Sequence, residues 1–182
     1  MKIINTAILA LSVILVSCSS APIGMITESP DEGFTKIAYE VEVSTSKDKV
    51  WKILEDYDNL SWSNTVKEAH YLNEKRSEIG MSRHCNLSDG GYIIETISKW
   101  DQGNGFSYTL DDSSDPINSK SYANWSVKGD DQKSVIRFEV HYALNYGFLG
   151  SAMNSLFAKA KFANSIKGFM HELKNHAEKK KM

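Results

Sequence analysis

The feature that most constrains the fold is a run of short strand-like segments separated only by turns. Asp89-Gly90 is typical of a tight hairpin turn, and residues 101–105 and 128–132 hold similar breaks. Short turns join only antiparallel strands, because parallel strands need a long crossover. We therefore expect an antiparallel sheet of seven strands, over residues 36–43, 66–72, 80–87, 92–100, 105–111, 120–127 and 133–144.

Helical patterns follow the first and the last of these strands. Thr45 and Asp48 resemble a capping box, and they begin a short helix whose apolar face holds Val50, Trp51, Leu54 and Tyr57. A second short helix or turn is expected over 59–64. The chain ends in a helical stretch from about 150 to 180 with one continuous apolar stripe. One long helix against an antiparallel sheet predicts an α+β fold, with room between helix and curved sheet.

The N-terminus has the pattern of a secretory leader. Residues 1–17 combine a single lysine with an apolar run too short to span a bilayer. The sequence Leu15-Val16-Ser17-Cys18 resembles a bacterial lipobox, which implies lipid on Cys18 after cleavage. The alternative is an ordinary signal peptide with a chance cysteine. We expect a lipidated tether over 18–35 and a domain over 36–180, and Ser19 after the cysteine favours the outer membrane, facing the periplasm.

Composition excludes some classes of function. The chain has 21 basic and 23 acidic side chains, so it lacks the basic excess that binds nucleic acid. Its two cysteines are Cys18 and Cys85; with lipid on the first, the second has no disulfide partner. The histidines show no metal-ligand spacing with cysteine or acidic residues. We predict no metal and no cofactor, and the oligomeric state stays open.

Several motifs resemble those of one superfamily. The segment 49–66 is similar to its opening helix and the tryptophan that follows, here Trp62. Residues 106–110 and 121–127 are similar to two of its later strands. A Gly-x-x-Arg strand, a tight turn, a strand glutamate and a closing aspartate match at Gly80, Arg83, Asp89-Gly90, Glu95 and Asp101. Together they resemble the START-related, polyketide-cyclase-like SRPBCC superfamily. The resemblance implies a helix-grip fold with an apolar small molecule between the long helix and the sheet.

A two-residue turn at Asp89-Gly90 would place Arg83 opposite Thr96 and His84 opposite Glu95. Arg83 would then lie on the cavity side, with His84 and Glu95 outside; a bulge at Gly91 would shift this register. A buried arginine needs a partner. That partner is either a ligand carboxylate or phosphate, or an internal acid, unless Arg83 lies at the edge of the sheet.

Four aromatic residues are candidates for the cavity wall, with plain core packing as the alternative. They are Trp62, Tyr108, Tyr122 and Trp125. The strand phase points Trp125 inward and Tyr122 the other way. With Arg83, these four form the predicted ligand-binding set, and no catalytic residue is assigned.

The sequence therefore predicts a lipid-anchored envelope protein that binds an apolar small molecule or lipid in its cavity. One alternative is a cyclase- or dehydratase-like enzyme, which needs His84 or Glu95 inside the cavity as acid or base. The other is a module that binds envelope proteins and has no open cavity.

Overall fold

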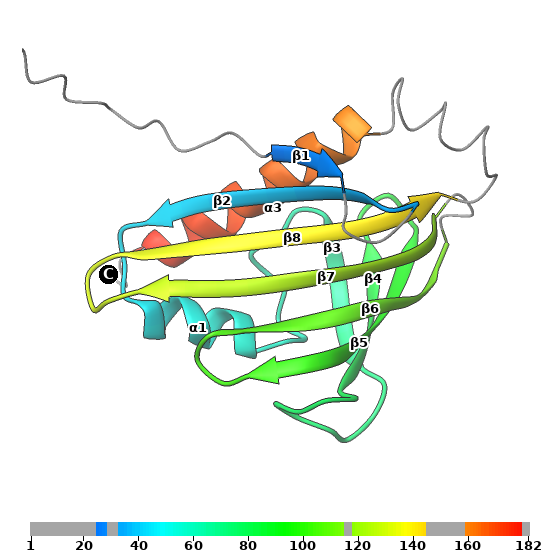
Figure 1. Ribbon diagram of the computed structural model, residues 1–182. Coiled ribbons are helices and arrows are strands. Elements are labelled where there is room, and N and C mark those ends of the chain that lie inside the picture. Colours follow the sequence, from blue (N-terminus) through cyan, green and yellow to red (C-terminus); the bar gives the residue numbers. More distant parts are fainter. Residues whose placement is uncertain (1–24, 29–32, 115–117, 145–158, 180–182) are drawn as a thin grey trace, which may run out of the picture.

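The computed structural model describes residues 25–28, 33–114, 118–144 and 159–179. Figure 1 shows a strongly curved sheet with two helices on its concave side. The elements in chain order are β1 Met25–Glu28, β2 Thr35–Val43, α1 Lys47–Glu55, β3 Val66–Tyr71, β4 Ser82–Leu87, β5 Tyr92–Asp101, β6 Gly105–Ser113, β7 Asn118–Gly129, β8 Ser134–Leu144 and α3 Lys159–Glu178.

The sheet is antiparallel throughout, in the order β1-β2-β8-β7-β6-β5-β4-β3. The α+β helix-grip architecture and all seven predicted strands are confirmed. The sheet has one further strand, because β1 pairs with the outer edge of β2. This short strand lies within the segment that we predicted as a tether.

The helices differ in detail from the prediction. Helix α1 is capped by Ser46, whose hydroxyl accepts from the Lys49 amide, so the predicted capping box at Thr45 is wrong. Residues 56–64 form turns, so of the helix or turn expected over 59–64 the structure has the turn. There the Ser61 backbone amide donates to the Asn59 side-chain oxygen at 3.4 Å, a local bond that competes with helical hydrogen bonds. The predicted helical stretch before Lys159 lies outside the described residues.

Helix α3 packs across the inner face of the sheet. Its buried residues Ile166, Met170 and Leu173 join one core with side chains from the strands and α1. Polar contacts hold its second half. The Asn64 amide and side chain both donate to the Glu172 carboxylate, at 2.9 and 2.8 Å. The α3 residues that line the cavity, Phe162, Ser165, Ile166 and Phe169, lie N-terminal to this contact.

The β4–β5 turn sets the register of the hairpin. The Leu87 amide donates to the Gly91 carbonyl, and Gly90 adopts φ +92°. This is a three-residue loop with a bulge, and glycine fits its left-handed position without strain. Arg83 therefore pairs with Glu95 and His84 with Ile94. Our predicted pairs, Arg83–Thr96 and His84–Glu95, are wrong by one residue.

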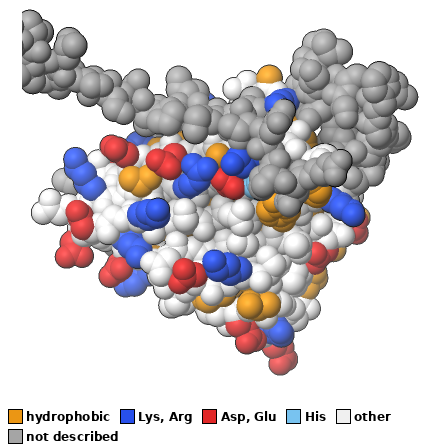
Figure 2. Space-filling model, in the orientation of Figure 1, with side chains coloured by type: hydrophobic (Ala, Val, Ile, Leu, Met, Phe, Trp, Pro, Cys, Tyr) orange, Lys and Arg blue, Asp and Glu red, His pale blue; other side chains and the backbone are white. Residues whose placement is uncertain are grey.

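The leader and Cys18 lie outside the described residues. The signal peptide, the lipidation and the domain bounds 1–17, 18–35 and 36–180 therefore stay predictions. Within the described ranges, no helix is long and apolar enough to cross a membrane. On the face that Figure 2 shows, Lys and Arg side chains are interspersed with Asp and Glu, so neither sign dominates it.

Candidate ligand-binding cavity

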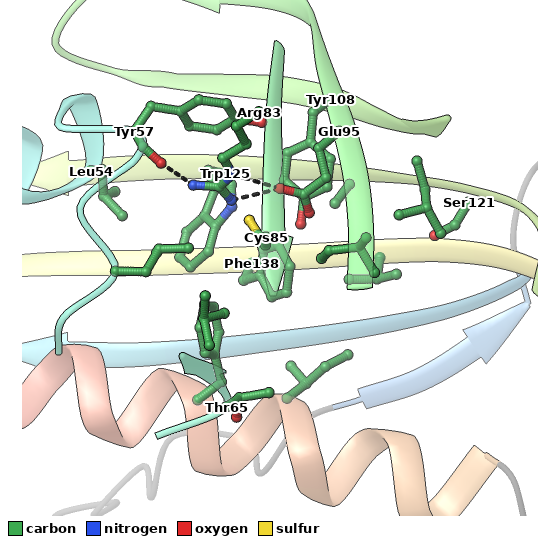
Figure 3. A pocket seen from close by; sticks show the side chains of 18 of the residues that line it. Leu54, Tyr57, Thr65, Arg83, Cys85, Glu95, Tyr108, Ser121, Trp125 and Phe138 are labelled. Carbon is green, nitrogen blue, oxygen red and sulfur yellow. Dashed lines mark hydrogen bonds and ion pairs between the residues drawn. The ribbon is translucent and has the colours of Figure 1, made fainter. Parts of the chain in front are cut away.

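A cavity of about 310 Å³ lies between the inner face of the sheet and α3. Figure 3 shows side chains of the strands, among them Arg83, Glu95 and Trp125, on the side of the sheet that faces α3. This volume is at the lower end of the usual range for small-molecule sites. Its apolar lining includes Leu60, Trp62, Val66, Leu87, Ile93, Phe106, Leu110, Trp125, Phe138, Val140, Phe162, Ile166 and Phe169.

An ion pair lies in the wall of this apolar space. Arg83 on β4 and Glu95 on β5 point inward from directly opposite positions. Glu95 Oε2 accepts from Arg83 Nε at 2.7 Å and lies 2.6 Å from Nη2. Their side chains are only 8% and 3% exposed. Of the two partners that the sequence allowed for Arg83, the structure supplies the internal acid.

Tyr57 closes the other side of Arg83. The arginine Nη1 donates to the Tyr57 carbonyl oxygen, and the guanidinium carbon lies 3.8 Å from the centroid of the Tyr57 ring. Burial lowers the pKa of Arg83, but the Glu95 charge and neighbouring groups more than offset this, so the pKa is raised overall. Arg83 therefore stays charged, held between a carboxylate, a carbonyl and an aromatic face.

The other ionisable groups beside this pair are held protonated. Burial raises the pKa of the Cys85 thiol to about 12. Burial also raises the pKa of the hydroxyls of Tyr57 and Tyr108 well above their ordinary value. At neutral pH the cavity wall therefore offers neither a thiolate nor a phenolate as nucleophile.

The predicted aromatic residues divide between the two faces of the sheet. Trp62, Tyr108 and Trp125 line the cavity, and Trp62 packs against Phe169 of α3 with 4.8 Å between ring centroids. Tyr122 is absent from the lining and stacks on His141 at 4.4 Å. The structure thus brings together Arg83 and three of the four aromatic candidates.

His84 lies on the outer face of the hairpin, stacked between the rings of His70 and Tyr92. Its position agrees with the prediction, whereas Glu95 lies inside, against the prediction. His141 on β8 is only 3% exposed and contacts Glu139 at 2.8 Å. In the described part of the chain, no group of three or more potential metal ligands is present.

Sequence reasoning missed several residues of the cavity. Phe162 and Phe169 follow the three- and four-residue spacing around Ile166, so the helical period could have found them. Phe138 alternates with Ile136 and Val140, which the strand period could have found. No local pattern signals that Tyr57 would meet Arg83, because 26 residues separate them.

The fold and the cavity define a helix-grip protein with an internal apolar site. The chain belongs to the family described as polyketide cyclase / dehydrase and lipid transport, whose model matches residues 35–178. This confirms the predicted membership of the SRPBCC superfamily. A search of curated protein sequences finds no match.

Solved structures of similar fold come from several bacteria. The Zhui aromatase/cyclase of Streptomyces sp. R1128 has a TM-score of 0.68 at 11% identity, covering 80% of this chain and 94% of that one. A START superfamily protein of Mycobacterium smegmatis has a TM-score of 0.62 at 13% identity, covering 79% and 97%. The protein XoxI of Bacillus cereus has a TM-score of 0.62 at 16% identity, covering 78% and 94%. At these identities the likeness concerns the fold alone.

Proposed function

We propose that this protein is a carrier or sensor that holds an apolar small molecule or lipid in the cavity between the sheet and α3. The observation that carries the proposal is the cavity of about 310 Å³ with a mostly apolar, aromatic lining. Apolar burial contributes about 25 cal/mol per Å², so such a site binds without any chemical step. The family description, which includes lipid transport, supports the same function.

Native mass spectrometry of the purified full chain tests this function. We expect an extra mass that disappears on denaturation and is recovered in an organic extract. A clean mass, together with no uptake of a neutral apolar dye such as N-phenyl-1-naphthylamine, would contradict the proposal. A variant that fills the cavity should lose both the extra mass and the dye.

We further propose that Cys18 carries lipid that anchors the domain in the cell envelope, at the outer membrane facing the periplasm. The support is the leader and the lipobox-like Leu15–Cys18. Stable anchoring takes two or more acyl chains. Cys18→Ala should move the protein from the membrane fraction to the soluble fraction. Unchanged membrane association would contradict the anchor.

A cyclase- or dehydratase-like reaction is the second candidate, since the carboxylate of Glu95 lies in the cavity wall. Glu95 meets the requirement for an acid or base inside the cavity, but its Oε2 is engaged by Arg83, and the other candidate, His84, lies outside. The third candidate, a module that binds envelope proteins, was expected to have no open cavity. The cavity between the sheet and α3 speaks against it. Turnover of an aromatic polyketide-like substrate that is abolished in Glu95→Gln would favour the enzyme.

A further inference from the structure

The charges around the cavity are unfavourable for an anion. Among the described residues that line it, the charged side chains are Arg83, Glu95 and Asp56. Arg83 is matched by Glu95, and Asp56, exposed at the end of α1, adds a further negative charge. The wall therefore carries an excess of negative charge, although it contains an arginine.

Each guanidinium nitrogen of Arg83 already has a partner in the protein. Nε and Nη2 contact Glu95, and Nη1 donates to the Tyr57 carbonyl oxygen. A ligand carboxylate would have to displace Glu95, which would leave a buried anion unpaired, or lie beside it as a second anion. The anion site that a buried arginine suggests is thus filled by the protein itself.

Two uncharged polar groups of the cavity residues lack such partners. The Tyr57 hydroxyl and the Trp62 indole N–H are buried and make no hydrogen bond within the described structure. Buried polar groups in proteins are nearly always hydrogen-bonded. An indole N–H only donates, so it requires an acceptor atom. A ligand with an alcohol, ester or ether oxygen carries such an acceptor without adding charge.

We infer that the cavity selects an uncharged amphiphile, an apolar chain or ring with an alcohol, ester or ether oxygen, over a fatty-acid-like anion. The inference rests on the proposed function, because it names the ligand class of the same cavity. It also reverses the role first expected for Arg83. The arginine neutralises Glu95 and shapes the wall, and it does not receive an acidic head group.

Displacement of N-phenyl-1-naphthylamine from the full chain at pH 8 tests this selection. The competitors are 1-decanol and decanoate, which have equal numbers of carbon atoms. We expect decanol to displace the dye at a concentration about tenfold lower than decanoate, because the decanoate charge would have no partner of opposite sign in the cavity. Displacement by decanoate at the same or lower concentration would overturn the inference and leave the proposed function intact. Failure of the dye itself to bind would overturn both.

Decanoate could bind more weakly than decanol because of the charges in the cavity or because it is more soluble in water. Two variants distinguish these causes. Glu95→Gln removes the internal partner of Arg83, so the affinity for decanoate should rise about tenfold while that for decanol changes less than about twofold. The control Arg83→Met/Glu95→Met removes both charges and should show no gain for decanoate. A folded Glu95→Gln protein without the selective gain would overturn the inference.

Asp56→Asn keeps the test decisive if Glu95→Gln does not fold. Asp56 is exposed, so its neutralisation leaves the core undisturbed. We expect decanoate to displace the dye at about two- to threefold lower concentration, because one partly screened negative charge is removed. The concentration of decanol that displaces the dye should change less than that of decanoate. An equal change for both competitors, or no change for either, would overturn the inference.

Discussion

The two faces of the β4–β5 hairpin differ in chemistry although their residues alternate along the same strands. On the inner face, Arg83 and Glu95 form a buried ion pair in the cavity wall. On the outer face, the His84 ring lies between the rings of His70 and Tyr92. The distances between ring centroids are 5.1 Å to His70 and 5.3 Å to Tyr92. The charge-paired groups face the ligand space, and the histidine that would be the natural acid or base faces away.

The conformation of the β4–β5 turn determines which side chains lie on the inner face and which on the outer face. Gly90 adopts a left-handed conformation, and the resulting bulge shifts β5 by one residue relative to a two-residue turn. Because side chains alternate, a one-residue shift changes which face each side chain meets. The difference between the faces therefore depends on local backbone geometry as much as on which residues are present.

The largest expected effect comes from breaking the inner pair. Arg83→Met alone should lower the free energy of unfolding by about 3–5 kcal/mol, because it leaves Glu95 buried without a partner. Arg83→Met/Glu95→Met should recover most of that loss. Urea denaturation of the wild type and both variants measures this. Equal stability of Arg83→Met and the wild type would mean that the pair is not buried as described.

The second largest effect is expected from alkaline pH, which should lower the free energy of unfolding through groups on the inner face. Cys85, Tyr57 and Tyr108 all have a raised pKa in the folded protein, chiefly through burial. The unfolded chain therefore releases these protons first, and the free energy of unfolding should fall as the pH rises above about 9. Denaturation at pH 8 and pH 10.5 tests the sign, and Cys85→Ala should reduce the slope. Stability that is flat or rising over this range would contradict it.

The turn should show an intermediate effect. Gly90→Ala should cost about 1–2 kcal/mol, because a β-carbon disfavours the left-handed conformation. No atom lies within 4 Å of where that carbon would be, so the cost is one of conformation and not of collision. Gly90→Asn is the matched control and should cost less, since asparagine tolerates this region. Thermal unfolding of both variants measures the difference, and equal losses would contradict the account.

The smallest effect is expected on the outer face. His84→Ala should change the free energy of unfolding by less than about 1 kcal/mol, because it removes a half-buried cross-strand contact. It should leave dye binding unchanged, since His84 does not line the cavity. A loss of binding as large as that of a cavity variant would mean that the outer face takes part in ligand recognition.

The sequence predicted the architecture well because its main signals are local. Turn residues and two-residue periodicity located the seven strands, and the strand phase placed Trp125 inward and Tyr122 outward. The partner of Arg83 could not be predicted in the same way. It depends on whether the loop is Asp89-Gly90 or Ser88-Asp89-Gly90, and the sequence fits both. The contact of Arg83 with Tyr57 depends on tertiary packing that no local pattern records.

The most direct test of the central claim compares one substitution on the two faces of β7. Ser121 lines the cavity, whereas Ser126 lies on the opposite face of the same strand. Ser121→Phe should fill the cavity and lower the affinity for N-phenyl-1-naphthylamine by about tenfold or more. Ser126→Phe should bind as the wild type does. Equal affinity in all three folded proteins would show that the dye binds elsewhere and would contradict a ligand site between the sheet and α3.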